Sequence, residues 1–325
     1  MAQQPPTTAL PAELPAGLAW GRVPAVSARL ARFAVRQPVA ALSALIVVAM
    51  VVMAIFAPLI APHDPLAINP RDRLLDPSGD HFFGTDSIGH DIFSQVVYGA
   101  RVSLLVGLGA TLAGTGIGSI IGLVTGYLGG LLDMLVQRIM DAVQAIPALV
   151  LLLLSAAILR EGDFREPFAI LNPVFRNDLL SVIVILSLLI APYASRVVRG
   201  VVLSTREDQY VLAARAIGAQ PARIMAFHIL PNVFAPIIVI CSITIGAAIL
   251  VEGALSFLGQ GIQPDDPTWK TSWGTMLRPA NLQYMQQAPL LAVFPGAAIT
   301  LAVLAFNMLG DTLRDVLDPQ LRGGA

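Results

Sequence analysis

Four side chains that could ligate a metal ion lie close together in one polar segment. They are His81, Asp86, His90 and Asp91, in the run His81-Phe-Phe-Gly-Thr-Asp86-Ser-Ile-Gly-His90-Asp91. Imidazole and carboxylate groups are common ligands of zinc and related ions, but compact sites have tighter spacings than this run offers. The spacing therefore favours a structural turn with aspartate caps, and we expect no metal site here.

One carboxylate, Glu252, lies deep in an apolar run that continues Glu252-Gly-Ala-Leu-Ser-Phe-Leu-Gly259. An acid within a membrane span is costly and by default indicates function. Two interpretations stay open. Glu252 lines the outer mouth of a membrane pathway and meets a substrate amine or cation, or it bonds to a neighbouring helix or snorkels outward.

Enzymatic chemistry is not indicated by the sequence. A phosphate-binding loop of the Gly-x-x-x-x-Gly-Lys-Ser/Thr type needs a lysine. The only lysine, Lys270, follows Trp269 and has no such loop before it. No Ser/His/Asp set stands out either, so we expect a chain that is not an enzyme and binds no cofactor.

The elements that hold these side chains are predicted to be membrane helices. The 325 residues are 56% hydrophobic and 13% charged, with a mean hydropathy of +0.74, which is typical of an integral membrane protein. The net charge of −1 argues against a nucleic-acid partner. The single cysteine, Cys241, lies in an apolar run and is expected to be a packed side chain.

Six apolar runs are long enough to cross a bilayer. They cover residues 39–60, 102–127, a third run ending at residue 159, 179–198, 233–257 and 289–309. We predict a cytoplasmic tail with a short interfacial helix over 1–36, a first membrane helix and extracytoplasmic loop over 37–101, a five-helix core over 102–310, and a cytoplasmic tail over 311–325. Arginines are more frequent in the segments that would be cytoplasmic, which favours both termini inside.

Three further patterns predict how the spans pack. Glycines recur every four residues in the second span, so they share one face and allow close helix approach, either as static packing or as a sliding surface; they are Gly114, Gly118, Gly122 and Gly126. Arg138 and Asp141 are three residues apart at the start of the third span and are expected to pair, with a kink at Pro147. Trp273 in the last outer loop, residues 259–287, fits an interfacial belt or a docking surface.

A polar loop, residues 203–232, separates the fourth and fifth runs. Ser204 or Thr205 is expected to cap a helix over 206–218, with Glu207 and Asp208 in its first turn. Gly218 would end that helix in a left-handed conformation.

A second short helix would begin at Pro221, and the next membrane helix at Pro231. The small side chains Ala213, Ala214 and Ala216 on the first helix suit docking of a partner better than a private core.

The same loop resembles the cytoplasmic coupling motif of ABC-importer permeases. The shared pattern is Ala213-Ala214-x-x-x-Gly218, then nine residues, then His228-x-Leu230-Pro231. Leu212 stands where many members have Glu, and His228 where many have Ile. Both departures resemble the dipeptide/oligopeptide/nickel branch. In that family this loop fits into a cleft on the ATP-hydrolysing subunit, which implies a coupling role for Arg206, Glu207, Asp208, Tyr210, Ala213, Ala214, Arg215, Gly218, His228, Leu230 and Pro231.

Two other stretches resemble the same branch. One is the Phe-Gly-Thr-Asp86 turn with its Gly-x-Asp91, followed by Gly-Ala-Arg101-Val-Ser103-Leu-Leu; His90 stands where Arg is usual, which leaves a role for that charge in doubt. The other is the run that starts at Glu252. With the closing stretch of the chain, the resemblance covers about residues 35–322.

The resemblance implies an all-α integral membrane protein with six transmembrane helices in the type I ABC-importer permease fold, and a coupling helix between spans four and five. It implies a C-type permease of the bacterial inner membrane that works with a second related permease, two ATP-binding subunits that hold ATP and magnesium, an extracytoplasmic binding protein, and membrane lipid. Dipeptides or oligopeptides are the expected cargo, and nickel or another small solute is the alternative. A secondary transporter without ATPases would need ionisable residues along several spans, and an intramembrane enzyme would need a catalytic set.

Overall fold

The computed structural model describes residues 37–160, 178–262 and 271–317. Apart from Pro38, the described helices all lie in one compact unit within residues 39–325. The expected interfacial helix, the C-terminal residues from 318, Trp269, and most of the loop at 160–178 lie outside the described residues.

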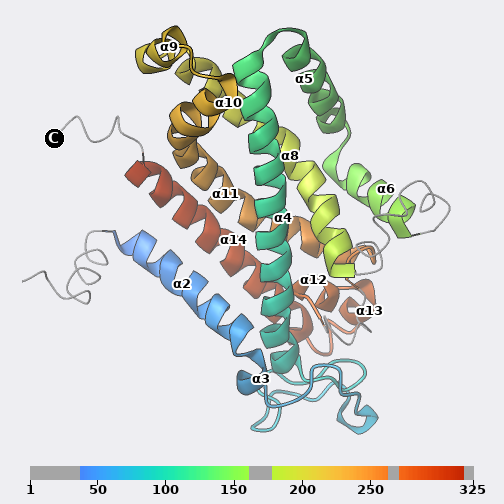
Figure 1. Ribbon diagram of the computed structural model, residues 1–325. Helices are drawn as coiled ribbons and strands as arrows, with labels where there is room; N and C mark the ends of the chain where they lie inside the picture. Colours follow the sequence, from blue (N-terminus) through green and yellow to red (C-terminus); the bar gives the residue numbers. More distant parts are fainter. Residues whose placement is uncertain (1–36, 161–177, 263–270, 318–325) are drawn as a thin grey trace, which may run out of the picture. The chain divides into compact units, whose positions relative to one another are not determined.

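Within the described residues, five helices are long and apolar enough to cross a membrane (Figure 1). Four of them are α2 (Pro38–Ile55), α4 (Ile92–Leu128), α8 (Asp178–Thr205) and α14 (Leu290–Leu317). The fifth is a continuous rod made of α10 (Pro221–Ile224), the π-helical turn η3 (Met225–Ile229) and α11 (Leu230–Phe257). The α-helical part, α11, begins at Leu230 with Pro231 in its first turn, as expected, although η3 and α10 continue the same rod before it. The wider π turn just before it accommodates a residue that has no N–H to donate.

The expected third span is broken into two helices, α5 (Gly130–Ala145) and α6 (Ala148–Arg160), that meet at 94°. The bend is much sharper than a proline kink. Ile146, which precedes Pro147, is extended at φ −78° and ψ 129°, as the residue before a proline tends to be. The helix therefore stops before the proline instead of bending through it, and the described residues contain up to six candidate spans if this pair counts as one.

Short elements join the long helices. They are α3 (Ala57–Ile60), the 3₁₀ turn η1 (Pro70–Asp72), α9 (Gln209–Ala216), α12 (Trp273–Met276) and α13 (Pro279–Leu282). In Figure 1, α9 and α10 lie at one end of the helices from α4 to α14, and α3 lies at the other end, with α12 and α13 in that half. The short connecting elements therefore lie toward the two opposite ends of the long helices.

Helix α4 packs along α8 through the four glycines at residues 114, 118, 122 and 126. A Cβ atom on Gly118 would overlap the carbonyl oxygen of Ala191, and one on Gly122 would overlap that of Ser195. Only glycine lets the two backbones approach this closely. The face that the spacing defines is therefore the face that contacts α8.

Helix α4 begins at Ile92, ten residues before the expected start of the second span at 102. The carboxylate of Asp91 accepts a hydrogen bond from the backbone N–H of Ser94, at 2.8 Å. Asp86 accepts from the backbone N–H groups of Ile88 and His90. The predicted turn with aspartate caps is confirmed, and the cap at Asp91 is what extends α4 outward.

Two ion pairs tie α5 to α8. Arg199 donates to both oxygens of Asp133, at 2.5 and 2.6 Å, and Arg196 donates to Asp141 at 2.6 Å. The predicted pairing of Arg138 with Asp141 along one helix is wrong. Asp141 instead meets an arginine on another helix, because α5 turns back along α8.

Candidate functional site: the coupling loop and the Glu252 network

The first helix of the coupling loop is shorter than expected. Helix α8 runs on to Thr205, and α9 begins at Gln209 with Asp208 at its N-cap position. Glu207 and Asp208 therefore precede the helix and do not form its first turn. The chain instead reverses over residues 206–208, which turns α9 away from α8.

The end of this helix follows the prediction. Gly218 has a φ of +81°, and its backbone N–H donates to the carbonyl of Arg215 at 3.0 Å. A left-handed residue here releases the chain from the helix. The next helix, α10, begins at Pro221, so both predictions are confirmed.

Helix α9 has a buried face and an exposed face. Val211 and Ala214 are buried with Ile224 and Ile229 in an apolar cluster that α9 and α10 share with α8 and α11. Of the small side chains expected to suit docking, Ala214 therefore faces this cluster instead. On the other face Leu212 is 43% exposed and Ile217 is 86% exposed. An exposed apolar surface at the tip of a polar loop is the kind of patch that a partner protein covers.

Three contacts hold the loop in place. Arg206 donates to the carbonyl of Gly126 at the end of α4, at 2.9 Å. The guanidinium of Arg215 lies 5.7 Å from the ring centroid of Tyr127, a cation–π distance. The loop is therefore fastened to α4, the helix that also contacts α8, α11 and α14.

The third contact joins α9 to the π turn. The side-chain amide of Asn232 donates to the hydroxyl of Tyr210 at 2.7 Å and to the carbonyl of His228 at 2.9 Å. Burial and the neighbouring Asp208 carboxylate raise the pKa of the Tyr210 phenol, so it stays protonated at neutral pH. A push on α9 would consequently reach the start of α11 through Tyr210.

A hollow of about 620 Å³ opens between α9 and α10, lined by Ala214, Ile217, Gly218, Ala219, Gln220, Arg223 and His228. Nδ1 of His228 is buried and has no hydrogen-bond partner among the described residues. Leu230 and Pro231 continue into α11 beyond the hollow. Of the predicted coupling residues, Ala214, Gly218 and His228 thus share one recess, and Arg206 and Tyr210 fasten the loop.

Glu252 is fully buried, with 0% of its surface exposed. Its carboxylate accepts hydrogen bonds from the hydroxyls of Ser256 at 2.7 Å, Ser272 at 2.8 Å and Ser103 at 3.5 Å. These serines come from α11, from the N-cap of α12 and from α4. In this conformation Glu252 joins three elements and presents no surface to a pathway, in agreement with the interpretation that it bonds to neighbouring helices.

The segment that supplies Ser272 is inserted between α4 and α11. Trp273 has 0% of its surface exposed, and its indole N–H donates to the carbonyl of Val96 at 2.9 Å. Glycines make room for it: a Cβ on Gly99 would lie 2.7 Å from the Trp273 ring. The expectation of an interfacial or docking role for Trp273 is therefore wrong. Its position next to a capping box at Ser272 was the sequence signal for a helix at this point.

The comparisons with known proteins agree with this arrangement. Residues 118–323 match the family of binding-protein-dependent transport system inner membrane components. Residues 30–77 match the N-terminal transmembrane domain of oligopeptide transport permease C. The chain belongs to this family of ABC-importer permeases.

Two relatives show how far the similarity extends. The chain is 42% identical over 287 residues to the dipeptide transport system permease protein DppC of Alkalihalophilus pseudofirmus, which covers 88% of each chain. It is 41% identical over 289 residues to the glutathione transport system permease protein GsiD of Escherichia coli, which covers 89% of this chain and 88% of the relative. The protein is thus a permease subunit of a binding-protein-dependent ABC importer, a multi-pass protein of the inner membrane, and not an enzyme.

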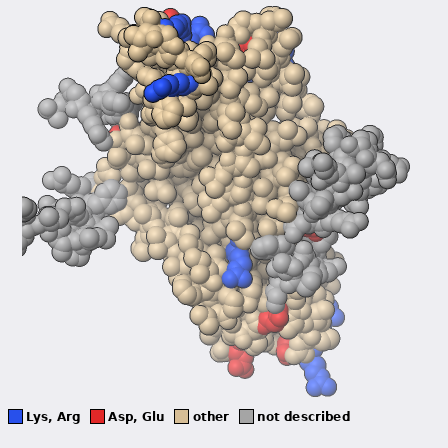
Figure 2. Space-filling model, viewed as in Figure 1, with Lys and Arg blue, Asp and Glu red and all other residues tan. Residues whose placement is uncertain are grey.

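Charged side chains of the permease gather mainly at the two ends of the described helices, over α9 and α10 and over the segment before α4 (Figure 2). At the second end the four side chains considered as metal ligands separate into two pairs. His90 bonds Asp86 at 2.8 Å, and His81 bonds Asp91 at 3.0 Å. Burial acts to raise the pKa of Asp86, but the bonds and charge of His90 and the backbone N–H donors outweigh it, so the pKa is lowered.

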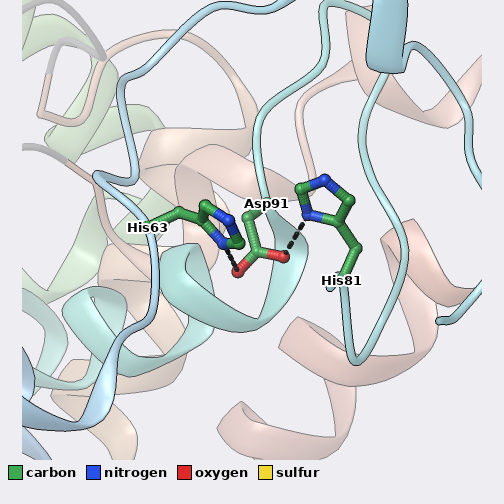
Figure 3. A group of neighbouring side chains, drawn as sticks. All are labelled: His63, His81 and Asp91. Carbon is green, nitrogen blue, oxygen red and sulfur yellow. Dashed lines mark hydrogen bonds and ion pairs between the residues drawn. The ribbon is translucent and has the colours of Figure 1, made fainter. Parts of the chain in front are cut away.

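The structure brings an additional histidine, His63, to the second pair. Nδ1 of His63 lies 3.9 Å from Oδ2 of Asp91 (Figure 3). His63 follows α3 and is far from Asp91 in the sequence, so residue spacing gave no signal for it. It donates its backbone N–H to the hydroxyl of Ser94, which anchors this part of the loop to the start of α4.

Proposed function

We propose that this permease forms half of a translocation pathway for small peptides and couples that pathway to partner ATPases through the loop at 203–232. The observation that carries the proposal is an exposed apolar surface, formed by Leu212 of α9 and by Ile217 directly after α9, on a loop fastened to α4 and α11. This loop also carries the coupling motif of the family.

The proposed coupling movement follows the contacts of the loop. Closure of the ATPases on nucleotide would press on α9 and fill the hollow beside His228. The push would pass through Tyr210 and Asn232 into the π turn and α11, and through Arg206 into α4. A π turn is a natural place for such a rearrangement, because its hydrogen bonds can shift register to those of an α-helix.

The orientation follows from charge. Arg206, Arg215 and Arg223 at the coupling end support a cytoplasmic position of that end under the positive-inside rule. Both termini would then be cytoplasmic, and the segment before α4 together with α12 would face outward. ATP and magnesium would be held by the ATPases, and this chain would bind no cofactor.

Small peptides are the substrate class that we propose. The two relatives are a dipeptide permease and a glutathione permease, and glutathione is itself a tripeptide. Nickel, the alternative raised by the sequence, has no comparable support. A second permease, two ATPases and an extracytoplasmic binding protein would complete the assembly, since one chain supplies only half of a two-fold pathway.

The test is to purify the chain from its native membrane in mild detergent and to identify the proteins that accompany it. Recovery of a related permease and ATPases, followed by ATP-dependent uptake of labelled di- and tripeptides into vesicles with the binding protein present, would support the proposal. A chain that is recovered alone and that moves solute without ATP would contradict it. Uptake of nickel but not of peptides would overturn only the substrate class.

A further inference from the structure

In the part of the chain that the structure describes, one group of three side chains has the chemistry of a metal site: His63, His81 and Asp91, at the end proposed to be extracytoplasmic (Figure 3). One ligand atom from each lies within 4.8 Å of the other two. His63 follows α3, His81 lies in the turn before α4, and Asp91 caps α4. Three separate parts of the segment between α2 and α4 therefore meet at one point.

The distances are close to those of a ligand shell. Two ligands on a tetrahedral zinc ion, each about 2.0–2.2 Å from the metal, are separated by about 3.4 Å. Nδ1 of His81 lies 3.0 Å from Oδ1 of Asp91, and Nδ1 of His63 lies 3.9 Å from Oδ2. Figure 3 shows a nitrogen of each ring turned toward the carboxylate. The three ligand atoms lie within 4.8 Å of one another, so both rings would move toward the carboxylate to reach coordination distance of one ion.

The carboxylate is held in position by the protein. The side chain of Asp91 is 1% exposed, and its Oδ2 accepts from the backbone N–H and the hydroxyl of Ser94, at 2.8 and 2.6 Å. Hydrogen bonds of this kind orient a ligating carboxylate and are a regular part of metal sites. The imidazole of His63, in contrast, is 42% exposed, which leaves a route for an ion and room for a water molecule as a fourth ligand.

The neighbouring pair of His90 with Asp86 provides an internal comparison. His90 is the single imidazole beside Asp86, whose Oδ2 also accepts from the side-chain amide of Gln95 at 3.4 Å. Asp91 has two imidazoles beside it, one more than Asp86 has. The two rings are stacked, with centroids 4.8 Å apart, so they lie side by side at the same carboxylate.

We infer that His63, His81 and Asp91 bind a divalent transition-metal ion, with zinc the best fit. Two imidazoles and one carboxylate suit zinc and its neighbours, whereas magnesium and calcium prefer oxygen ligands alone. Three protein ligands leave a fourth position for water. The bound ion would clamp the part of the loop after α3 and the turn at His81 onto the start of α4, and so fix the shape of this outer surface.

The experiment uses the full chain with the subunits that co-purify, stripped with a chelator and then titrated with Zn²⁺, or with Co²⁺ for its absorption spectrum. We expect the wild type to bind one more ion than His63→Ala does, or to bind it at least about tenfold more tightly. X-ray absorption on the zinc-loaded protein should show imidazole nitrogen and carboxylate oxygen ligands. Zinc should also slow amide hydrogen exchange over residues 61–91 in the wild type and not in His63→Ala.

The matched control is His90→Gln, which removes a histidine of the same loop from outside the cluster and should leave zinc binding unchanged. Because His63 is exposed, His63→Ala should fold normally; Asp91→Asn, which keeps a capping oxygen, is the second variant and should also weaken binding. Equal zinc binding by the wild type and both cluster variants would overturn the inference. Equal loss of binding in His90→Gln and His63→Ala would overturn it as well.

Discussion

The two ends of this permease differ in the burial and hydrogen bonding of their side chains. At the end with α3 and α12, the outer end in the proposed orientation, Glu252 and Trp273 are completely buried, and their polar atoms are bonded to α4 and α12. At the coupling end, Leu212 and Ile217 are exposed, and a buried nitrogen of His228 has no partner in the described part of the chain.

The comparison indicates that a buried network in which every polar atom is hydrogen-bonded holds helices together. An exposed apolar surface, in contrast, indicates a site where another protein binds. Substitutions at the outer end should therefore reduce stability, and substitutions on the exposed face of α9 should reduce coupling while stability is kept.

The largest effect is expected from Glu252→Ala. It removes the common acceptor of Ser103, Ser256 and Ser272, and each buried hydroxyl left without a partner costs about 1–3 kcal/mol. We expect a loss of several kcal/mol in the free energy of unfolding, measured as a lower thermal midpoint of the purified protein. Thr300→Ala, which removes a hydroxyl from an exposed position of α14, is the control. Equal thermal midpoints for the two variants would show that the Glu252 network does not hold the helices together.

The next effect concerns the exposed face of α9. Ile217→Asp places a charge on the apolar surface proposed to dock on an ATPase, and a central interface residue is typically worth about 2 kcal/mol or more. We expect ATP-dependent uptake to fall by at least about tenfold, with an unchanged thermal midpoint. Gln209→Ala, at an exposed polar position of the same helix, should have little effect. Normal uptake by Ile217→Asp would remove α9 from the proposed interface.

A smaller effect is expected at the point where the loop meets α4. Arg206→Ala removes the hydrogen bond from the guanidinium to the Gly126 carbonyl. A hydrogen bond from a charged donor is worth about 1.5–3 kcal/mol at most, and less where solvent is nearby. We expect uptake to fall about two- to fivefold, because the loop moves more freely against α4. Glu207→Ala removes only the exposed partner of Arg206, and such surface pairs contribute about 0–1 kcal/mol. If both variants transport equally, the bond to Gly126 does not transmit the push.

The smallest effect is a pH dependence at the outer end. The pKa of Asp86 is lowered by His90 and backbone donors against the effect of burial, so the stability it contributes is present above the unfolded value of about 3.9. That stability is lost as the pH falls below this value through the folded pKa. The protection of the amides of residues 84–92 against hydrogen exchange, relative to their intrinsic exchange rates, should fall there, and Asp86→Asn should flatten the dependence. A dependence of the same steepness in Asp86→Asn would assign it to other acids.

Much of the fold was predictable because its signals are local. Hydropathy gives the membrane helices, and the glycine spacing gives the face of α4 that meets α8. Gly218 releases the chain after α9, and Pro221 begins α10, as their backbone preferences predict. The start of α4 was misplaced because the Asp91 cap carries the helix ten residues beyond its apolar run, and hydropathy does not record caps.

The candidate sites were predictable only in part. Motif residues predicted a coupling role for the loop at 203–232, which stays a prediction, and which residues of α9 face outward depended on the turn at residues 206–208. The pairing of Asp141 with Arg196 depended on the 94° break before Pro147, which a proline alone does not specify.

The sequence by itself determined that this chain is an ABC-importer permease, since a bilayer demands long apolar helices and the coupling motif is contiguous in the chain. Only the tertiary structure decided what the polar side chains do. Ser103, Glu252 and Ser272 form one network, and His63 joins His81 and Asp91, because helix packing brings together residues that lie far apart in the sequence. Hydrogen bonding and metal ligation depend on distances of about 2–3 Å, and those distances are fixed by packing.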